Sequence, residues 1–223
     1  MFFYSLVFLK AQVYNTANLN EKMEITPLIQ KAIAKIGEIH QDQPRRAEDF
    51  PYVAHPYAVA IMLSTYTQNE DIIVAGLLHD VLEDVDPTIY SGEDICRDFS
   101  HVICHIVQEV SVLETAHRRS VLKLSWRSRK LKYLAQLKTA SPEALIICAA
   151  DKIHFLQSIM TSYSQQGDEL WAKFNALPEE RLWFCQEILQ ILQNRLNHRI
   201  VHKFANTLAK ATPILKSPPK IPL

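Results

Sequence analysis

Glycine is scarce in this chain, with 4 residues among 223, against an average usage of about 7%. The shortage argues against glycine-rich phosphate loops, dinucleotide-binding folds and all-β folds with many tight turns. Net charge is also absent, because 24 basic side chains balance 24 acidic ones. Without a positive field, we expect neither nucleic acid nor a membrane surface as a partner.

Cysteine pairs of the C-x-x-C type are missing as well. The four cysteines, Cys96, Cys104, Cys148 and Cys185, are dispersed among apolar neighbours. A free cysteine in such surroundings acts as a small core residue, so we expect four free thiols. The expected location is therefore the reducing cytoplasm.

The apolar run at the N-terminus, Met1 to Leu9, is too short to span a membrane. It has no basic residues before it and no evident small-residue cleavage site after it. We interpret residues 1–22 as an N-terminal extension that is loosely ordered or packed on the periphery. The alternative is that they are extra sequence upstream of a functional start at Met23.

Helix signals recur along the rest of the chain, without a convincing alternating strand pattern. Thr26-Pro27 and Ser141-Pro142 each supply an N-cap followed by proline at the first helical position. We predict an all-α single domain over residues 23–212, followed by an extended proline-rich tail, 213–223. Predicted helices cover residues 57–66, 69–82, 126–137, 142 to about 163, 168–174, 178–192 and 198–211, and others begin after Thr26, Ser91 and Ser100.

Ionisable side chains lie inside two of the most apolar predicted helices. In AGLLHDVLED, His79 and Asp80 occupy positions expected in the core, and Glu83 and Asp84 follow one turn later. Burying such groups is costly unless something pairs them. The spacing of four lets His79 with Glu83, and Asp80 with Asp84, project to one side of a helix.

Two further polar residues lie in comparable places, Asp151 within LIICAADKIHFL and His55 at the helix start in YVAHP. A cation that accepts imidazole nitrogens and carboxylate oxygens would explain all of these positions. Taken singly, each has a plainer interpretation. His55 beside proline can be a cap, a His-Asp dipeptide arises by chance, and Asp151 can pair with Lys152.

Three segments carry a family resemblance: QPRRAEDFPYVAHPYAVA at 43–60, AGLLHDVLED at 75–84 and ADKIHFL at 150–156. They resemble, in the same order, three motifs of the HD-domain metal-dependent phosphohydrolases. The resemblance is closest to the RelA/SpoT hydrolase domain and the small alarmone hydrolases, and it covers approximately residues 36–192. It implies a single HD-domain helical bundle that hydrolyses a guanosine 3′-pyrophosphate nucleotide with one divalent ion, typically Mn²⁺.

The resemblance also implies roles for individual residues. It identifies Glu83 and Asp84 with the pair that orients or deprotonates the attacking water, and His154 with a supporting position. The implied metal ligands are His55, His79, Asp80 and Asp151. The implied substrate-binding residues are Arg45, Arg46 and Lys152.

Departures from the family pattern concern the nucleotide rather than the metal. The family glycine after the basic pair is absent, Phe155 stands where the family has asparagine, and Gln157 stands where it has arginine. An aromatic ring cannot replace the hydrogen bonds of an amide, so we predict a broader or shifted nucleotide preference. The alternative is that Phe155 points into the core.

A basic segment without Asp or Glu runs from Thr115 to Pro142. Within it, Trp126, Arg129 and Lys130 resemble a W-x-x-R-K segment of small HD proteins, which implies binding of a polyanionic substrate. A solvated helix face is the other interpretation. Three functions remain open: hydrolysis of the guanosine alarmone, hydrolysis of another nucleoside phosphate, and nucleotide binding by an HD module without turnover.

Overall fold

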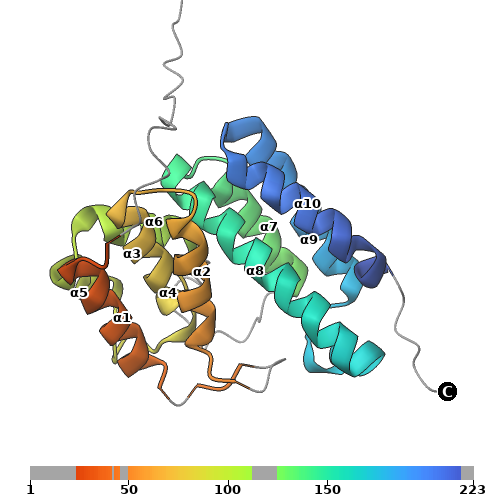
Figure 1. Ribbon diagram of the computed structural model, residues 1–223, viewed down its shortest axis with the longest axis horizontal. Coiled ribbons are helices and arrows are strands. Elements are labelled where there is room, and N and C mark those ends of the chain that lie inside the picture. The colour runs from red at the N-terminus through yellow and green to blue at the C-terminus, as the bar shows by residue number, and fades with distance from the viewer. Residues whose placement is uncertain (1–23, 42, 46–49, 112–124, 217–223) are drawn as a thin grey trace, which may run out of the picture.

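The computed structural model describes residues 24–41, 43–45, 50–111 and 125–216. In these ranges the protein is helical, apart from an isolated bridge between Pro44 and Pro51, so the all-α prediction is confirmed. Figure 1 shows α8 running between α1–α6 on one side and α9 and α10 on the other. The elements are α1 Pro27–Ile39, α2 Ala54–Ser64, α3 Glu70–Leu78, α4 Val81–Asp84, α5 Gly92–Asp98, α6 His101–Val110, α7 Trp126–Leu137, α8 Pro142–Gln166, the 3₁₀ helix η1 Gly167–Lys173, α9 Pro178–Arg195 and α10 Arg199–Lys216.

Side-chain caps start most of these helices where the sequence predicted. The hydroxyls of Thr26, Ser100 and Ser141 each accept a hydrogen bond from a backbone N–H in the first turn. Ser91 does the same and forms a capping box with Asp94. Each such cap is worth about 0.5–2 kcal/mol, so local chemistry defines the ends of the helices around the core.

The central helix, α8, packs against α2, α3, α6, α9, α10 and η1. Every residue from 144 to 150 is buried, and the helix ends at Gly167, whose φ of 58° suits glycine. By length and composition, Pro142–Lys173 could cross a membrane, yet 56% of the apolar window is buried inside the fold. Burial of that kind is expected of the core helix of a globular domain.

Two boundaries differ from the sequence expectation. The helix predicted over 69–82 is broken, because α3 ends at Leu78 and α4 begins at Val81. The tail expected to be extended from Pro213 instead continues α10 to Lys216. Leu215 is fully buried there, so tertiary packing outweighs the usual cost of a proline within a helix. Residues 1–23 and 217–223 lie outside the described part of the chain.

The expectation of four free thiols is wrong for one pair. Cys96 of α5 and Cys104 of α6 form a disulfide, with their Cα atoms 5.1 Å apart, whereas Cys148 and Cys185 are free and buried. A short turn folds α6 back against α5, and this brings together two positions that lie eight residues apart. The sequence spacing alone does not reveal that approach.

Helices α2 and α3 approach closely at Gly76. A Cβ atom added there would lie 2.2 Å from Cδ1 of Leu63 and 3.8 Å from Cγ1 of Val59. Leu63 is itself fully buried, which limits how far its side chain can move aside. The missing side chain at residue 76 therefore allows α2 and α3 to pack at this distance.

We predict that Gly76→Ala lowers the free energy of unfolding by about 1–2 kcal/mol, because overpacking costs about 1–3 kcal/mol and improved helix propensity returns at most about 1 kcal/mol. Chemical denaturation monitored by circular dichroism would measure the change. Gly92→Ala is the matched control, since its Cβ would meet atoms only at 3.6 and 3.8 Å. Equal stability of the two variants would contradict the close approach at Gly76.

Candidate metal centre and active site

The break between α3 and α4 has a local cause in the side chain of His79. Its Nδ1 donates a hydrogen bond to the carbonyl oxygen of Gly76, at 2.8 Å. In an uninterrupted helix this carbonyl would accept from the amide of Asp80, four residues on. The imidazole thus competes with the helix for one acceptor, and the chain turns at His79 and Asp80.

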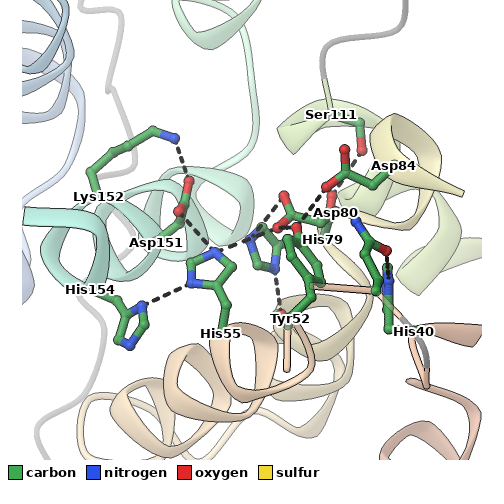
Figure 2. Close-up of polar contacts among 12 residues, drawn as sticks. His40, Tyr52, His55, His79, Asp80, Asp84, Ser111, Asp151, Lys152 and His154 are labelled. Atoms are coloured by element: carbon green, nitrogen blue, oxygen red, sulfur yellow. Dashed lines mark hydrogen bonds and ion pairs between the residues drawn. The ribbon is translucent and has the colours of Figure 1, made fainter. Parts of the chain in front are cut away.

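This turn brings His79 and Asp80 to one place together with His55 of α2. One ligand atom from each of the three residues lies within 4.8 Å of the others. Asp151 of α8 adjoins them, with its Oδ1 3.3 Å from Nε2 of His55. Figure 2 shows these side chains converging from α2, from the α3–α4 turn and from α8. The four predicted ligands therefore come together, with Asp151 at the edge of the group.

The hydrogen-bonding pattern around this group suits a cation. A carbonyl only accepts, so Nδ1 of His79 carries a proton, and in the neutral ring Nε2 carries a lone pair. That Nε2 is buried without a hydrogen-bond partner, although it lies 3.2 Å from a carboxylate oxygen of Asp80. With a neutral ring, two acceptors face each other at this distance, and a cation between them would remove the repulsion. The donor set of imidazole nitrogens and carboxylates therefore fits a divalent metal ion.

His154 supports His55 from behind. Their Nδ1 atoms are 2.8 Å apart, and burial together with the neighbouring His55 lowers the pKa of His154 to about 4. His154 is accordingly neutral near pH 7, and its Nδ1 can accept a hydrogen bond from Nδ1–H of His55. That arrangement directs the lone pair on Nε2 of His55 toward Asp80 and Asp151, as orienting partners of metal-binding histidines commonly do. The supporting position expected for His154 is the one that the structure shows.

Tyr52 is a site residue that the sequence reasoning did not single out. Its hydroxyl contacts Oδ2 of Asp80 and lies 2.7 Å from Oδ2 of Asp84. Burial and the charge of Asp80 raise the pKa of Asp84, and burial raises that of Tyr52 well above its usual range. The P-Y-x-x-H-P segment could have predicted this role, because the phenol of Tyr52 lies three residues before His55 and can reach the same centre.

His40 lies behind Tyr52, with their ring centroids 4.9 Å apart. It is 1% exposed, and its Nδ1 donates to the side-chain oxygen of Gln43, at 2.7 Å. The backbone N–H of Tyr52 donates to the carbonyl of Gln43, at 2.9 Å. These contacts hold Tyr52 against the carboxylates of Asp80 and Asp84.

Buried cations form the opposite flank of the centre. Burial alone would lower the pKa of Lys152, but the Asp151 carboxylate, 2.5 Å away, raises it above its ordinary value. Burial and the charge of Lys152 lower the pKa of Lys130, and Glu83 acts in the opposite direction. Glu83 is thus close to the lysines, while Asp84 is on the Tyr52 side. The two acids therefore interact with different groups, Glu83 with the lysines and Asp84 with Tyr52.

A cavity of about 400 Å³ opens onto this centre. Phe155 and Phe174 also line its wall, and the guanidinium of Arg181 lies 4.2 Å from the ring of Phe174 and 5.7 Å from that of Phe155. Phe155 therefore faces the cavity as well as packing against the core. Of the predicted site residues that the structure describes, those lining the cavity are Arg45, His55, Asp80, Asp84 and Asp151.

The remaining predicted substrate residues are placed differently. Lys130 packs over the ring of Phe184, at 5.0 Å, on the flank that it shares with Lys152. Arg129 is on the same helix, α7. Among the described residues, neither of these two nor Lys152 lines the cavity itself. Arg46 lies outside the described part of the chain, so its predicted role stays a prediction.

Comparisons with known sequences agree with this site. A family model described as "HD domain" matches residues 32–178. The GTP pyrophosphokinase of Streptomyces coelicolor is 32% identical over 146 residues, which are 62% of this chain and 16% of that protein. The guanosine-3′,5′-bis(diphosphate) 3′-pyrophosphohydrolase of Borreliella burgdorferi is 30% identical over 131 residues, 58% of this chain and 18% of that protein. The chain thus spans less than a fifth of the length of these two relatives.

Solved structures share the fold. A metazoan ortholog of SpoT, described as hydrolysing ppGpp, superposes with a TM-score of 0.66 at 21% identity, over 85% of this chain and 97% of that one. A Listeria monocytogenes protein superposes with a TM-score of 0.61 at 28% identity, over 73% of this chain and 99% of that one. Since the family model covers more than half of the chain and its histidines and aspartates meet at one centre, the protein belongs to the HD domain family.

Proposed function

We propose that this protein is a divalent-metal-dependent phosphohydrolase that removes pyrophosphate from the 3′ position of guanosine 3′,5′-bis(diphosphate). The observation that carries the proposal is the convergence of His55, His79 and Asp80 beside Asp151, at the end of a nucleotide-sized cavity. The similarity to the Borreliella guanosine-3′,5′-bis(diphosphate) 3′-pyrophosphohydrolase supports this choice of substrate. In this reaction water adds to phosphorus and the bond to the 3′ oxygen breaks, so that pyrophosphate is released and guanosine 5′-diphosphate leaves with a 3′ hydroxyl.

The four ligands would hold one divalent ion, which we propose to be Mn²⁺. When bound, such an ion supplies Lewis-acid chemistry, namely activation of water and polarisation of a phosphoryl oxygen. The protein supplies the geometry, because Gly76 and His154 fix the orientations of His79 and His55. Orienting partners of this kind sharpen both metal affinity and geometry.

Asp84 is the better placed of the two acids to take the proton from water. It lines the cavity, and its pKa is raised by burial and by Asp80. A general base works best when its pKa approaches the operating pH. We assign Glu83 a charge-balancing role beside Lys130 and Lys152, through which it supports the same step.

Cations on both sides of the centre would neutralise the substrate phosphates. Arg45 lines the cavity, and we propose that Arg46 also contributes to phosphate binding. Lys130, Lys152 and Arg129 form the other side. Because the phosphates carry several negative charges, Arg45 would make charge-assisted contacts with them, while Lys130 and Lys152, which do not line the cavity, would add a favourable electrostatic field.

A related nucleotide is the alternative substrate, and Phe155 is the observation that favours it. This ring faces the cavity beside Phe174, where an amide would offer hydrogen bonds to the ribose or base. Stacking distinguishes one purine from another less sharply than hydrogen bonding does. The proposal therefore includes turnover of nucleotides other than the guanosine alarmone.

The direct test incubates the purified protein with a panel of nucleotides and Mn²⁺, Mg²⁺ or Zn²⁺, and resolves released phosphate from pyrophosphate. Release of pyrophosphate from guanosine 3′,5′-bis(diphosphate) with Mn²⁺ is the expected result. Release of phosphate alone would change the reaction class. Tight nucleotide binding without any product would identify a binding module instead.

Metal retention is the first prediction. After incubation with Mn²⁺ and desalting, the protein should hold about one ion per chain, because the convergent ligands form one site. Asp80→Ala should lose it, as measured by elemental analysis, while circular dichroism shows the helices intact. Glu38→Ala is the control, since this acid is exposed on α1 and pairs with Lys35 at the surface. Full occupancy in Asp80→Ala would place the metal elsewhere.

The acids give the second prediction. Asp84→Asn should retain the metal and lower kcat by about 100-fold or more, the usual effect of losing a general base. Glu83→Gln should also retain metal and lower kcat, because Lys130 and Lys152 lose a balancing charge. Steady-state kinetics with metal analysis would measure both effects. An unchanged kcat in the two variants would remove this pair from the mechanism.

Base selectivity gives the third prediction. Phe155→Asn combined with Gln157→Arg should raise the kcat/KM ratio of guanosine over adenosine 3′,5′-bis(diphosphate) by about tenfold, since each new hydrogen bond adds discrimination. Gln157→Arg alone is the control, and thermal denaturation would register any loss of packing at Phe155. A wild-type enzyme already strongly selective for guanosine would contradict the stacking argument.

A further inference from the structure

The disulfide between α5 and α6 joins two chemically unequal sulfur atoms. Cys96 and Cys104 have their Cα atoms 5.1 Å apart, inside the usual range for a disulfide. Cys104 is 1% exposed, whereas Cys96 is only partly buried. A reagent from solution can therefore approach one sulfur much more easily than the other.

An open cavity of about 880 Å³ adjoins the exposed side of this bond. Cys96 lines it together with Glu93, Arg97, His101 and Gln108, and Cys104 is not among the lining residues. The space is large enough for a small thiol-bearing peptide. It lies on α5 and α6, away from the cavity that opens onto the metal centre.

The surroundings of Cys104 suit a departing thiolate. Nε2 of Gln108 lies 3.6 Å from Sγ of Cys104 and donates toward it. The carbonyl oxygen of Gly92 lies 3.1 Å from the same sulfur, in position to accept a hydrogen bond from the thiol once it is protonated. One neighbour thus stabilises the sulfur as an anion and the other stabilises it as a thiol.

We propose that Cys96–Cys104 is a reversible thiol–disulfide exchange site that reacts with low-molecular-weight thiols at Cys96. The attacking thiolate forms a bond to Sγ of Cys96, the Cys96–Cys104 bond breaks, and its electron pair leaves with Cys104, which takes a proton from water. A second thiol then displaces Cys96 from the mixed disulfide. The protein gains two thiols, and the reagent becomes its own disulfide.

This assignment is independent of the proposed hydrolase activity. It would let the link between α5 and α6 form and break in the reducing cytoplasm that the sequence predicts. Helix α6 is followed by Ser111, whose hydroxyl contacts the carbonyl oxygens of Val107, at 2.7 Å, and of His79, at 3.1 Å. The exchange site and the metal centre are therefore attached to opposite ends of one helix.

The test traps the mixed disulfide and identifies its sulfur. Full-length Cys104→Ser and Cys96→Ser variants are incubated with glutathione disulfide, quenched with acid and analysed by peptide mass spectrometry. Glutathione should attach to Cys96 in the first variant about tenfold or more faster than to Cys104 in the second, because access governs exchange. Wild-type protein in glutathione redox buffers should interconvert between the disulfide and the dithiol.

Two buried thiols provide an internal control for folding. Burial raises the pKa of Cys148 to about 11 and that of Cys185 to about 12, so neither should be modified while the fold persists. Modification of Cys104 as fast as Cys96, with these two thiols unmodified, would overturn the proposed asymmetry. Free thiols at both positions of the wild-type protein in a fully oxidising buffer would overturn the exchange site itself.

Discussion

The hydrogen bond from Nδ1 of His79 to the carbonyl of Gly76 is the interaction on which the rest of the site depends. It accompanies the end of α3, and the buried Nε2 of the same ring has no hydrogen-bond partner. His79 and Asp80 are adjacent at this turn, and both side chains reach one centre beside His55. The same turn starts α4, which carries Glu83 and Asp84.

The acidic side chains of the centre have different partners on its two sides. On one flank, the phenol of Tyr52 contacts Asp80 and Asp84. On the other, the Lys152 ammonium pairs with Asp151. Burying charges costs free energy unless partners compensate them, and here each acid has a cation or a hydrogen-bond donor nearby. A polar layer is thus held between α2, α4 and α8 inside an otherwise apolar domain.

Local rules predicted the helices well, because caps such as Thr26 and Ser141 determine a helix start from a few neighbouring atoms. The grouping of His55, His79, Asp80 and Asp151 was also predictable, since ionisable groups in apolar helices need a partner. The break at His79 was not predictable, because it depends on whether the His79 imidazole or the backbone amide of Asp80 donates a hydrogen bond to the carbonyl of Gly76. Tyr52 and the Cys96–Cys104 bond were missed for a different reason. Both depend on distances between helices, which a sequence pattern does not contain.

The close approach at Gly76 has a consequence for the metal centre that neither helix shows alone. This glycine sets the gap between α2 and α3, and those helices carry His55 and His79, whose ring centroids are 5.1 Å apart. The packing of α2 against α3 therefore sets how close the imidazole of His55 lies to that of His79. Because a ligand that binds only the folded state stabilises it, widening this gap would weaken metal affinity and resistance to unfolding together. A change that loosens the packing at Gly76 is therefore expected to lower metal affinity as well as the free energy of unfolding.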